Sequence, residues 1–169
     1  QNIGNPEKLS TDIGPVIDKE AYNNIKKHID NFDNVYQTDF QKDLGYFIPP
    51  TLIEIKKLSD LNNEVFGPVV HIIKYKASEL NELIDDINEL GFGLTLGIHS
   101  RLDKTIDKIV SKAEVGNIYI NRNMIGAVVG VQPFGGFEKS GTGPKAGGPE
   151  YLKRLCYEQS ISNNTAAMG

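Results

Sequence analysis

From residue 69 onward, the chain alternates between short β-rich runs and amphipathic helical segments. The runs at 69–75, 94–99 and 116–121 are too short for helices, are bounded by turn residues and are rich in Ile, Val, Leu and Tyr. Between them, 79–89 and 104–112 carry apolar residues at helical spacing. This order makes two consecutive βαβ units, which predict an α/β fold with a mostly parallel sheet and flanking helices.

Capping residues mark where the helices are expected to begin and end. Asp18 is expected to cap a first helix at 19–32, and Ser78 and Asp103 are expected to cap the two later helices. Gly91 follows the second helix and is expected to end it.

The remaining parts of the chain carry weaker signals. Residues 1–17 are rich in Gly, Pro, Asn and Ser and predict an irregular entry segment. A β-rich run at 51–55 predicts another strand, and 156–161 is expected to form one more. Residues 162–169 have the composition of a frayed tail.

Composition excludes several classes of protein. A net charge of −4 argues against a nucleic-acid binder, which normally carries a basic excess. No apolar run approaches the roughly 20 residues that span a bilayer. The single cysteine excludes an internal disulfide framework and predicts a reducing, cytoplasmic compartment. The chain begins with Gln1 rather than Met, so we expect a piece of a longer protein.

Residues 122–150 are rich in glycine and proline and directly follow a predicted strand, which is where α/β proteins build ligand sites. A phosphate loop is a poor match here. Gly136 and Gly141 have the spacing of a Walker loop, but Thr142 stands where the lysine belongs. The pattern instead favours a close-packed loop, in which glycines let the backbone approach a ligand or a neighbouring segment.

Metal and nucleophile motifs are absent from the sequence. His28, His71 and His99 lack the spacing of a zinc site, so no metal is expected, and the last two fall in predicted strands as structural residues. Cys156 is the only thiol, and its neighbours Leu155 and Tyr157 favour a structural role.

The segment from Glu64 to Pro68 precedes a predicted strand and carries a carboxylate and a phenyl ring two residues apart. Gly67 and Pro68 restrict the backbone, so Glu64 and Phe66 are expected on the same edge. A carboxylate there can accept two hydrogen bonds from a ribose diol, and a phenyl can pack on a flat ring. The alternative is a plain turn with a helix-capping glutamate, and local chemistry favours neither.

A second segment has the features of an anion site. Backbone N–H groups in the turn at Gly126 and Ala127 form a small concavity that suits a carboxylate. Phe134, held by Pro133 and two glycines, is placed to line an aliphatic substrate chain. The alternative is an apolar loop that only packs.

Six segments between about Pro6 and Arg154 resemble the aldehyde dehydrogenase superfamily, in family order and spacing. They are DIGPVID (12–18), GYFIPPTL (45–52), EVFGP (64–68), GLTLGIHS (93–100), VGNIYINRN (115–123) and QPFGGFEKSGTGPKAGGP (132–149). The stretch INRNMIGAVVGVQPFGG followed by SGTGPKAGGPEYL is similar to the glutamate-semialdehyde (Δ1-pyrroline-5-carboxylate) dehydrogenases. It most resembles the dehydrogenase half of the bifunctional proline-utilisation enzymes.

The resemblance implies roles for five residues. Glu64 would hold the nicotinamide-side ribose hydroxyls of NAD, and Phe66 would pack near the nicotinamide ring. Gly126 and Ala127 would donate backbone N–H groups to the α-carboxylate of glutamate semialdehyde, and Phe134 would line its aliphatic portion. These roles favour a carboxylate-bearing aldehyde over an alkyl one.

The resemblance also implies that essential groups lie elsewhere. In the family a cysteine thiolate attacks the aldehyde, hydride leaves to NAD, and a glutamate-activated water hydrolyses the thioester. Both groups and the Rossmann domain lie upstream of the matched segment, and Cys156 does not match the nucleophile. Residues 1–155 are therefore expected to be the C-terminal portion of the catalytic domain, and 156–169 a terminal oligomerisation-type strand and tail. The isolated chain is expected to be inactive.

The sequence thus predicts part of an NAD-dependent L-glutamate γ-semialdehyde dehydrogenase of proline catabolism. The parent enzyme is expected to form a homo-oligomer. The sequence leaves open whether a proline dehydrogenase domain is covalently linked to it. Two alternatives remain: an aldehyde dehydrogenase of another subclass, and a non-catalytic module that keeps the fold for assembly or binding.

Overall fold

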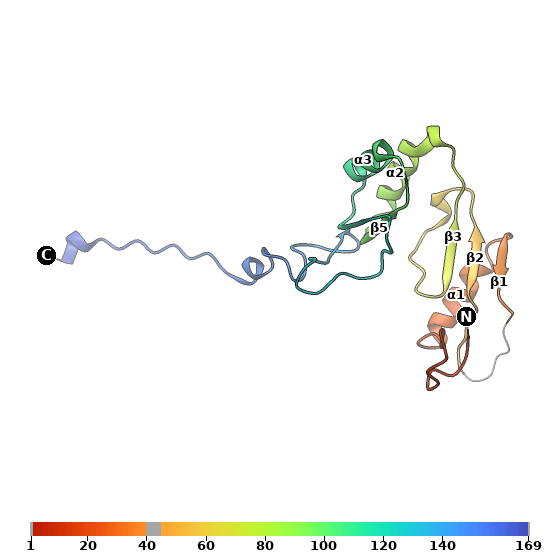
Figure 1. The fold of residues 1–169 in the computed structure, drawn as a ribbon. Helices are drawn as coiled ribbons and strands as arrows, with labels where there is room; N and C mark the ends of the chain where they lie inside the picture. The colour runs from red at the N-terminus through yellow and green to blue at the C-terminus, as the bar shows by residue number, and fades with distance from the viewer. Residues whose placement is uncertain (1, 40–44, 169) are drawn as a thin grey trace. The chain divides into compact units, whose positions relative to one another are not determined.

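The computed structural model describes residues 2–39 and 45–168, and Figure 1 draws the chain as a ribbon. The chain divides into two compact units, Gln1–Leu90 and Gly91–Gly169. Each unit is built from its own strands and helices and is described by itself.

The first unit contains a three-stranded sheet in the order β1–β2–β3. Strand β1 (Val35–Gln37) pairs antiparallel with β2 (Thr51–Glu54), and β2 pairs parallel with β3 (Val69–Ile72). The strands predicted at 51–55 and 69–75 are therefore confirmed, with shorter bounds. Strand β1 is not predicted, because three residues are too few to show an alternating pattern.

Helix α1 (Lys19–Ile29) begins where the sequence predicts it to begin. The Asp18 side chain accepts a hydrogen bond from the Ala21 N–H at 2.8 Å, which satisfies one of the free donors of the first turn. The helix ends before residue 32, because the Phe32 N–H donates to the Ile29 carbonyl in a tighter turn.

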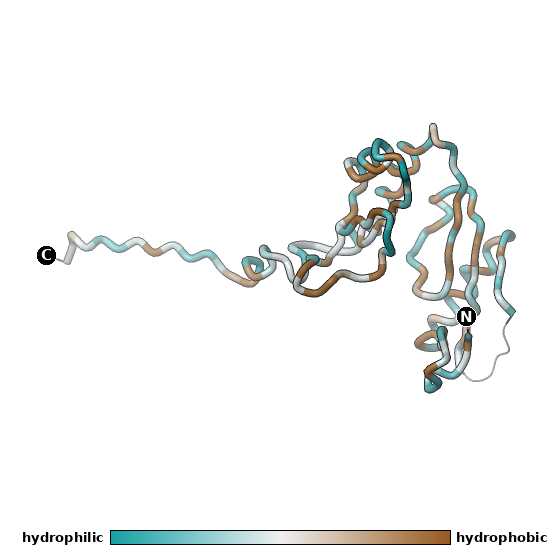
Figure 2. The backbone as a smooth tube through the Cα atoms, in the orientation of Figure 1, coloured by the Kyte–Doolittle hydropathy of each residue, from teal (hydrophilic) through white to brown (hydrophobic). Residues whose placement is uncertain are grey.

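The core of the first unit lies between α1 and β2. Two α1 residues, Ile25 and Ile29, pack with Ile53, which is fully buried on β2. Figure 2 shows hydrophobic residues along β2 and β3. Among the helices that the structure describes, none combines the length and apolar character needed to cross a bilayer.

Helix α2 (Leu80–Leu90) confirms the second predicted helix but not its predicted cap. A short 3-10 turn, η2 (Ala77–Glu79), precedes it, so Ser78 lies inside a turn and is not the N-cap. The Glu79 carboxylate accepts a hydrogen bond from the Lys76 N–H at 2.8 Å instead. Gly91 follows α2 with φ of 71°, which confirms it as the residue that ends the helix.

The second unit contains the second of the two predicted βαβ units. Strand β5 (Thr95–Ile98), helix α3 (Asp103–Lys112) and strand β6 (Asn117–Ile120) follow one another, and β5 pairs parallel with β6. The α/β class is confirmed. The prediction of a first βαβ unit, which would pair β3 with β5, is wrong for the described residues. Strand β3 pairs in parallel with β2, and β5 pairs in parallel with β6.

Asp103 is the first residue of α3 rather than its cap. The N-cap is Leu102, whose side chain cannot accept a hydrogen bond. The Ser100 hydroxyl oxygen accepts from the Leu102 N–H at 3.1 Å, so a serine two residues earlier supports the chain where it enters the helix.

The glycine-rich segment is mostly irregular, as the sequence predicts. A two-residue strand, β7 (Phe137–Glu138), pairs antiparallel with β4 (Phe92–Gly93). A Cβ atom added to Gly136 would lie 2.7 Å from the Gly93 carbonyl oxygen, so only glycine allows these backbones to approach. The interpretation of a close-packed loop is confirmed at this position.

The C-terminal segment does not form the expected strand within this chain. After the 3-10 turn η3 (Leu152–Leu155), residues 156–164 have no regular structure, and Tyr157 is fully exposed. A strand needs a hydrogen-bonded neighbour, and no described strand pairs with this segment. A second 3-10 turn, η4 (Thr165–Met168), closes the described chain.

Candidate functional site

Glu64 and Phe66 lie on a loop that leads into β3. The loop is fixed at its far end, because the Thr51 N–H of β2 donates to the Pro68 carbonyl at 2.8 Å. Gly67 sits against α1, where an added Cβ would lie 2.6 Å from the Ile25 Cδ1 atom. The loop presents Phe66 to solvent, with 79% of its surface exposed, so its ring is accessible to a ligand.

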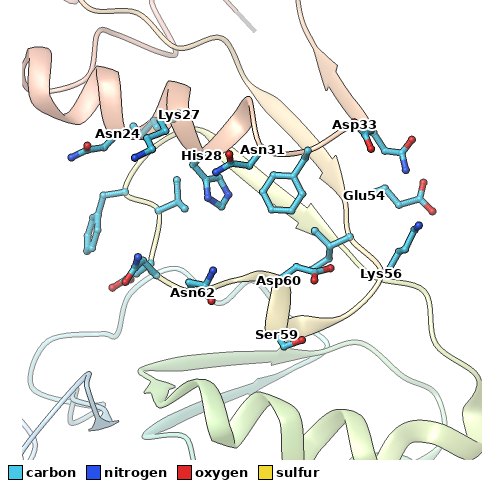
Figure 3. Close-up of a pocket in the computed structure, with 18 of the residues that line it drawn as sticks. Asn24, Lys27, His28, Asn31, Asp33, Glu54, Lys56, Ser59, Asp60 and Asn62 are labelled. Atoms are coloured by element: carbon cyan, nitrogen blue, oxygen red, sulfur yellow. The ribbon is translucent and has the colours of Figure 1, made fainter.

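Both residues line an open pocket of about 1100 Å³ in the first unit (Figure 3). Asn24, Lys27 and His28 come from α1, and the opposite side is formed by the 3-10 turn η1 (Leu58–Asp60) and the loop that follows it to residue 66. The lining thus combines an amide, a cation and carboxylates with an exposed aromatic ring. Such a set suits a polar ligand that has hydroxyl groups and a flat ring.

A pair of histidines lies beside this pocket. The Nε2 atoms of His28 on α1 and His71 on β3 are 2.8 Å apart, and the ring of Phe32 packs 5.0 Å from the His28 ring. Burial lowers the pKa of His28, and burial together with the charge of His28 lowers the pKa of His71. Sequence spacing could not reveal this pair, since the partners are 43 residues apart.

Because of the histidine pair, we expect the free energy of unfolding of the protein to fall in acid. Both pKa values lie below the unfolded value of 6.5, so the folded state binds fewer protons, and the contribution is complete only above pH 6.5. It falls as the pH drops below that value, because protonation places charge on partly buried rings and, for His71, beside the charge of His28. We expect the urea concentration at the midpoint of unfolding to decrease less steeply with decreasing pH in His28→Gln than in wild type. His99→Gln is the control, and equal slopes in all three proteins would contradict the prediction.

In the second unit, the candidate anion site follows the carboxyl end of β6. Asn121 directly follows this strand and has φ of 53°. Its side chain accepts from the Ser100 N–H and donates to the Ser100 carbonyl after β5, each at 3.0 Å. The carboxyl ends of two parallel strands are thereby tied together. Ligands of parallel α/β sheets bind at such an edge.

The turn at Gly126 and Ala127 presents two amide N–H groups. Gly126 has φ of 65°, and within the described part of the chain neither N–H donates to a protein acceptor. The next N–H, that of Val128, is taken by the Gln132 side-chain oxygen at 3.0 Å. The N–H groups of residues 122–125 likewise have no protein acceptor among the described residues, so Gly126 and Ala127 belong to a run of open donors. Adjacent open N–H groups in a turn are what a small anion site requires.

Phe134 lies at the other end of the same loop and is half-buried. It forms an antiparallel bridge with Ala146, with N–H to O distances of 3.0 Å and 2.9 Å. The buried Asn117 side chain donates to the Gly135 carbonyl at 2.9 Å, and Lys145 Nζ donates to the Gly116 carbonyl. These bonds fasten the Phe134 end of the loop to the start of β6.

The structure thus groups the five predicted site residues by unit. Glu64 and Phe66 share a pocket of the first unit, and Gly126, Ala127 and Phe134 share a loop of the second. Their ligands stay predictions.

Sequence reasoning missed the supporting residues Asn117, Tyr119 and Lys145. The alternation of side chains along β6 could have revealed two of them, because it places Asn117 and Tyr119 on the same, buried face of the strand.

Cys156 is exposed, and its thiol donates to the Leu152 carbonyl at 3.4 Å. No group of three or more potential metal ligands occurs among the described residues.

Comparison with known proteins identifies relatives of this chain. The model of the aldehyde dehydrogenase family matches residues 1–161. The chain is 54% identical to the bifunctional protein PutA of Klebsiella aerogenes, over 90% of this chain and 12% of that protein. It is 40% identical to 1-pyrroline-5-carboxylate dehydrogenase of Anoxybacillus flavithermus, over 95% of this chain and 32% of that protein.

Solved structures agree with this result. A mutant of proline utilization A (PutA) from Bradyrhizobium japonicum matches 99% of this chain and 18% of its own chain, with a TM-score of 0.88 and 46% identity. A 1-pyrroline-5-carboxylate dehydrogenase from Thermus thermophilus, an R-to-A mutant, matches 90% of this chain and 30% of its own, with a TM-score of 0.79. The chain therefore spans about an eighth of the curated PutA proteins and about a third of the curated 1-pyrroline-5-carboxylate dehydrogenases that it matches.

Proposed function

The chain belongs to the aldehyde dehydrogenase family, and on that premise we propose that it is part of an enzyme that oxidises L-glutamate γ-semialdehyde to L-glutamate with NAD. The observation that carries the proposal is the pair of free N–H groups at Gly126 and Ala127. They suit a substrate that carries a carboxylate, which glutamate semialdehyde does and a plain alkyl aldehyde does not. The PutA and 1-pyrroline-5-carboxylate dehydrogenase relatives support the same substrate.

In this proposal each unit holds one reactant. Gly126 and Ala127 bind the substrate carboxylate, and Phe134 packs against the aliphatic chain between the carboxylate and the aldehyde. On the first unit, Glu64 accepts hydrogen bonds from a ribose diol and the exposed ring of Phe66 packs on a flat heterocycle. NAD, when bound, supplies the acceptor for the hydride.

The fit of NAD to these residues rests on their chemistry. A carboxylate can take both hydroxyls of a ribose, and the 79% exposed phenyl ring of Phe66 is available to stack. Lys27 on the opposite side of the same pocket adds a cation that suits a phosphate-bearing molecule.

The rest of the enzyme is proposed to lie in a longer protein. We assign the nucleophilic cysteine and the general-base glutamate to parts outside residues 1–161, since Cys156 does not match the family nucleophile. A linked proline dehydrogenase domain, a homo-oligomer and a cytoplasmic location complete the proposal. The first of these rests on the bifunctional PutA relatives.

Replacement of Glu64 tests the cofactor role. In the full-length protein that contains this chain, Glu64→Ala is expected to lower kcat/KM for NAD by about tenfold to a hundredfold, because hydrogen bonds to a charged group are lost. Steady-state NADH formation at varied NAD measures the change. The control is Glu82→Ala, an exposed carboxylate of α2. Wild-type kinetics in Glu64→Ala would remove Glu64 from the site.

A further inference from the structure

The peptide between Gly126 and Ala127 is held from one side by a buried tyrosine. The Tyr119 hydroxyl donates to the Gly126 carbonyl oxygen at 3.0 Å, and the tyrosine is only 6% exposed. Tyr119 lies on β6, a hydrogen-bonded strand, so its ring has a fixed base. This contact spans seven residues and joins the core of the second unit to the turn of the loop.

The bonded carbonyl and the proposed anion donor belong to the same peptide group. A trans peptide is planar, and its C=O and N–H bonds point in opposite directions. The Gly126 carbonyl points to Tyr119, so the Ala127 N–H points away from Tyr119. One hydrogen bond therefore sets the direction of the N–H that the proposed function assigns to the substrate carboxylate.

Such a restraint is needed here because glycine does not supply one. Gly126 has φ of 65°, and a Cβ added to it would find no atom within 4 Å, so neither a side chain nor crowding restricts rotation of the peptide that follows it. A rotated peptide would present a carbonyl oxygen, which repels a carboxylate. The Tyr119 bond favours the orientation that presents the donor.

The same bond strengthens the donor. A peptide whose carbonyl accepts a hydrogen bond is polarised and donates more strongly through its N–H. Arg122 adds positive charge beside this tyrosine, with its guanidinium carbon 5.1 Å from the ring centroid. Both effects favour an anion at the turn.

We propose that Tyr119 is a positioning residue for carboxylate recognition: its hydroxyl fixes the Gly126–Ala127 peptide so that the Ala127 N–H faces the substrate. Tyr119 itself does not touch the substrate. The inference rests on the proposed function, because it assumes that this turn binds the carboxylate of the aldehyde. It goes further by assigning the substrate preference to a buried side chain of β6.

Tyr119→Phe in the full-length protein tests this role, since it removes the hydroxyl and keeps the ring. We expect KM for L-glutamate γ-semialdehyde to rise about three- to tenfold with kcat unchanged, the range for one lost hydrogen bond. The KM for pentanal, which has no carboxylate, is expected to stay at the wild-type value. The inhibition constant of the product L-glutamate is expected to rise by the same factor as KM, which gives a readout independent of turnover.

Tyr36→Phe is the matched control, because Tyr36 is exposed on β1 and lies in neither proposed site, so the change should alter nothing. Equal losses toward both aldehydes would assign Tyr119 a purely structural role and overturn the proposal. Wild-type KM values in Tyr119→Phe, with wild type still preferring glutamate semialdehyde, would overturn it and leave the proposed function standing. A wild-type enzyme with no preference for the carboxylate-bearing aldehyde would overturn the proposed function and this inference with it.

Discussion

Replacement of Gly116 by alanine is expected to destabilise the second unit by about 3 kcal/mol or more. An added Cβ would overlap the Gly135 carbonyl oxygen, which is a backbone atom that cannot rotate away. That carbonyl is also held by the Asn117 side chain at 2.9 Å, and Lys145 holds the Gly116 carbonyl. Relief of the overlap would break these bonds and displace Gly135, the neighbour of Phe134.

Chemical unfolding of the wild type and of Gly116→Ala measures this loss. Gly4→Ala is the control, because an added Cβ there meets only the Thr11 hydroxyl oxygen at 3.8 Å, an ordinary contact. The control is expected to stay within about 0.5 kcal/mol of wild type. A Gly116→Ala protein of wild-type stability would show that β6 and the Phe134 segment do not pack as described.

Ala127→Pro is expected to lower kcat/KM for L-glutamate γ-semialdehyde by about a hundredfold. Proline has no N–H, so the substitution deletes one of two donors proposed for the carboxylate, and hydrogen bonds to charged groups contribute about 1.5–3 kcal/mol. The residue before a proline is also restricted, which disfavours the present turn at Gly126. Turnover of pentanal is expected to change far less, since that aldehyde has no carboxylate.

Ala127→Gly separates loss of the donor from loss of the side chain. It keeps the N–H and is expected to retain kcat/KM within about threefold of wild type. Kinetics with both aldehydes, in wild type and the two variants, measure the effect. Full activity of Ala127→Pro toward glutamate semialdehyde would exclude the Gly126–Ala127 turn as the carboxylate site.

Local chemistry made some elements predictable. Asp18 caps α1 because its short carboxylate reaches the N–H three residues on, and Gly91 ends α2 because glycine adopts a positive φ without strain. The second βαβ unit follows from the same kind of signal, since its strands and helix carry distinct periodicities.

Long-range partners could not be predicted in the same way. The sequence does not show that β3 pairs with β2 rather than β5, because the pattern of a run predicts a strand but does not identify its neighbour. The contact between His28 and His71 depends on how α1 packs against the sheet, and Ile25 and Ile29 take part in that packing.

The candidate site was predictable at the residues that we propose bind ligands, and not at the residues that support them. Glu64 and Phe66 stand out because a carboxylate and a phenyl ring share a constrained turn. The sequence alone predicts only that Tyr119 is a buried residue of a strand. Its role depends on one hydrogen bond to Gly126, seven residues away along an irregular loop.

We propose that this chain helps to form a glutamate-semialdehyde dehydrogenase with a carboxylate-binding turn. The most direct test is NADH formation by the full-length protein, with NAD and either L-glutamate γ-semialdehyde or pentanal as substrate. We predict at least about tenfold higher kcat/KM for the semialdehyde, as recognition of one charged group allows. No NADH from the semialdehyde, or equal kcat/KM for both aldehydes, would contradict the claim.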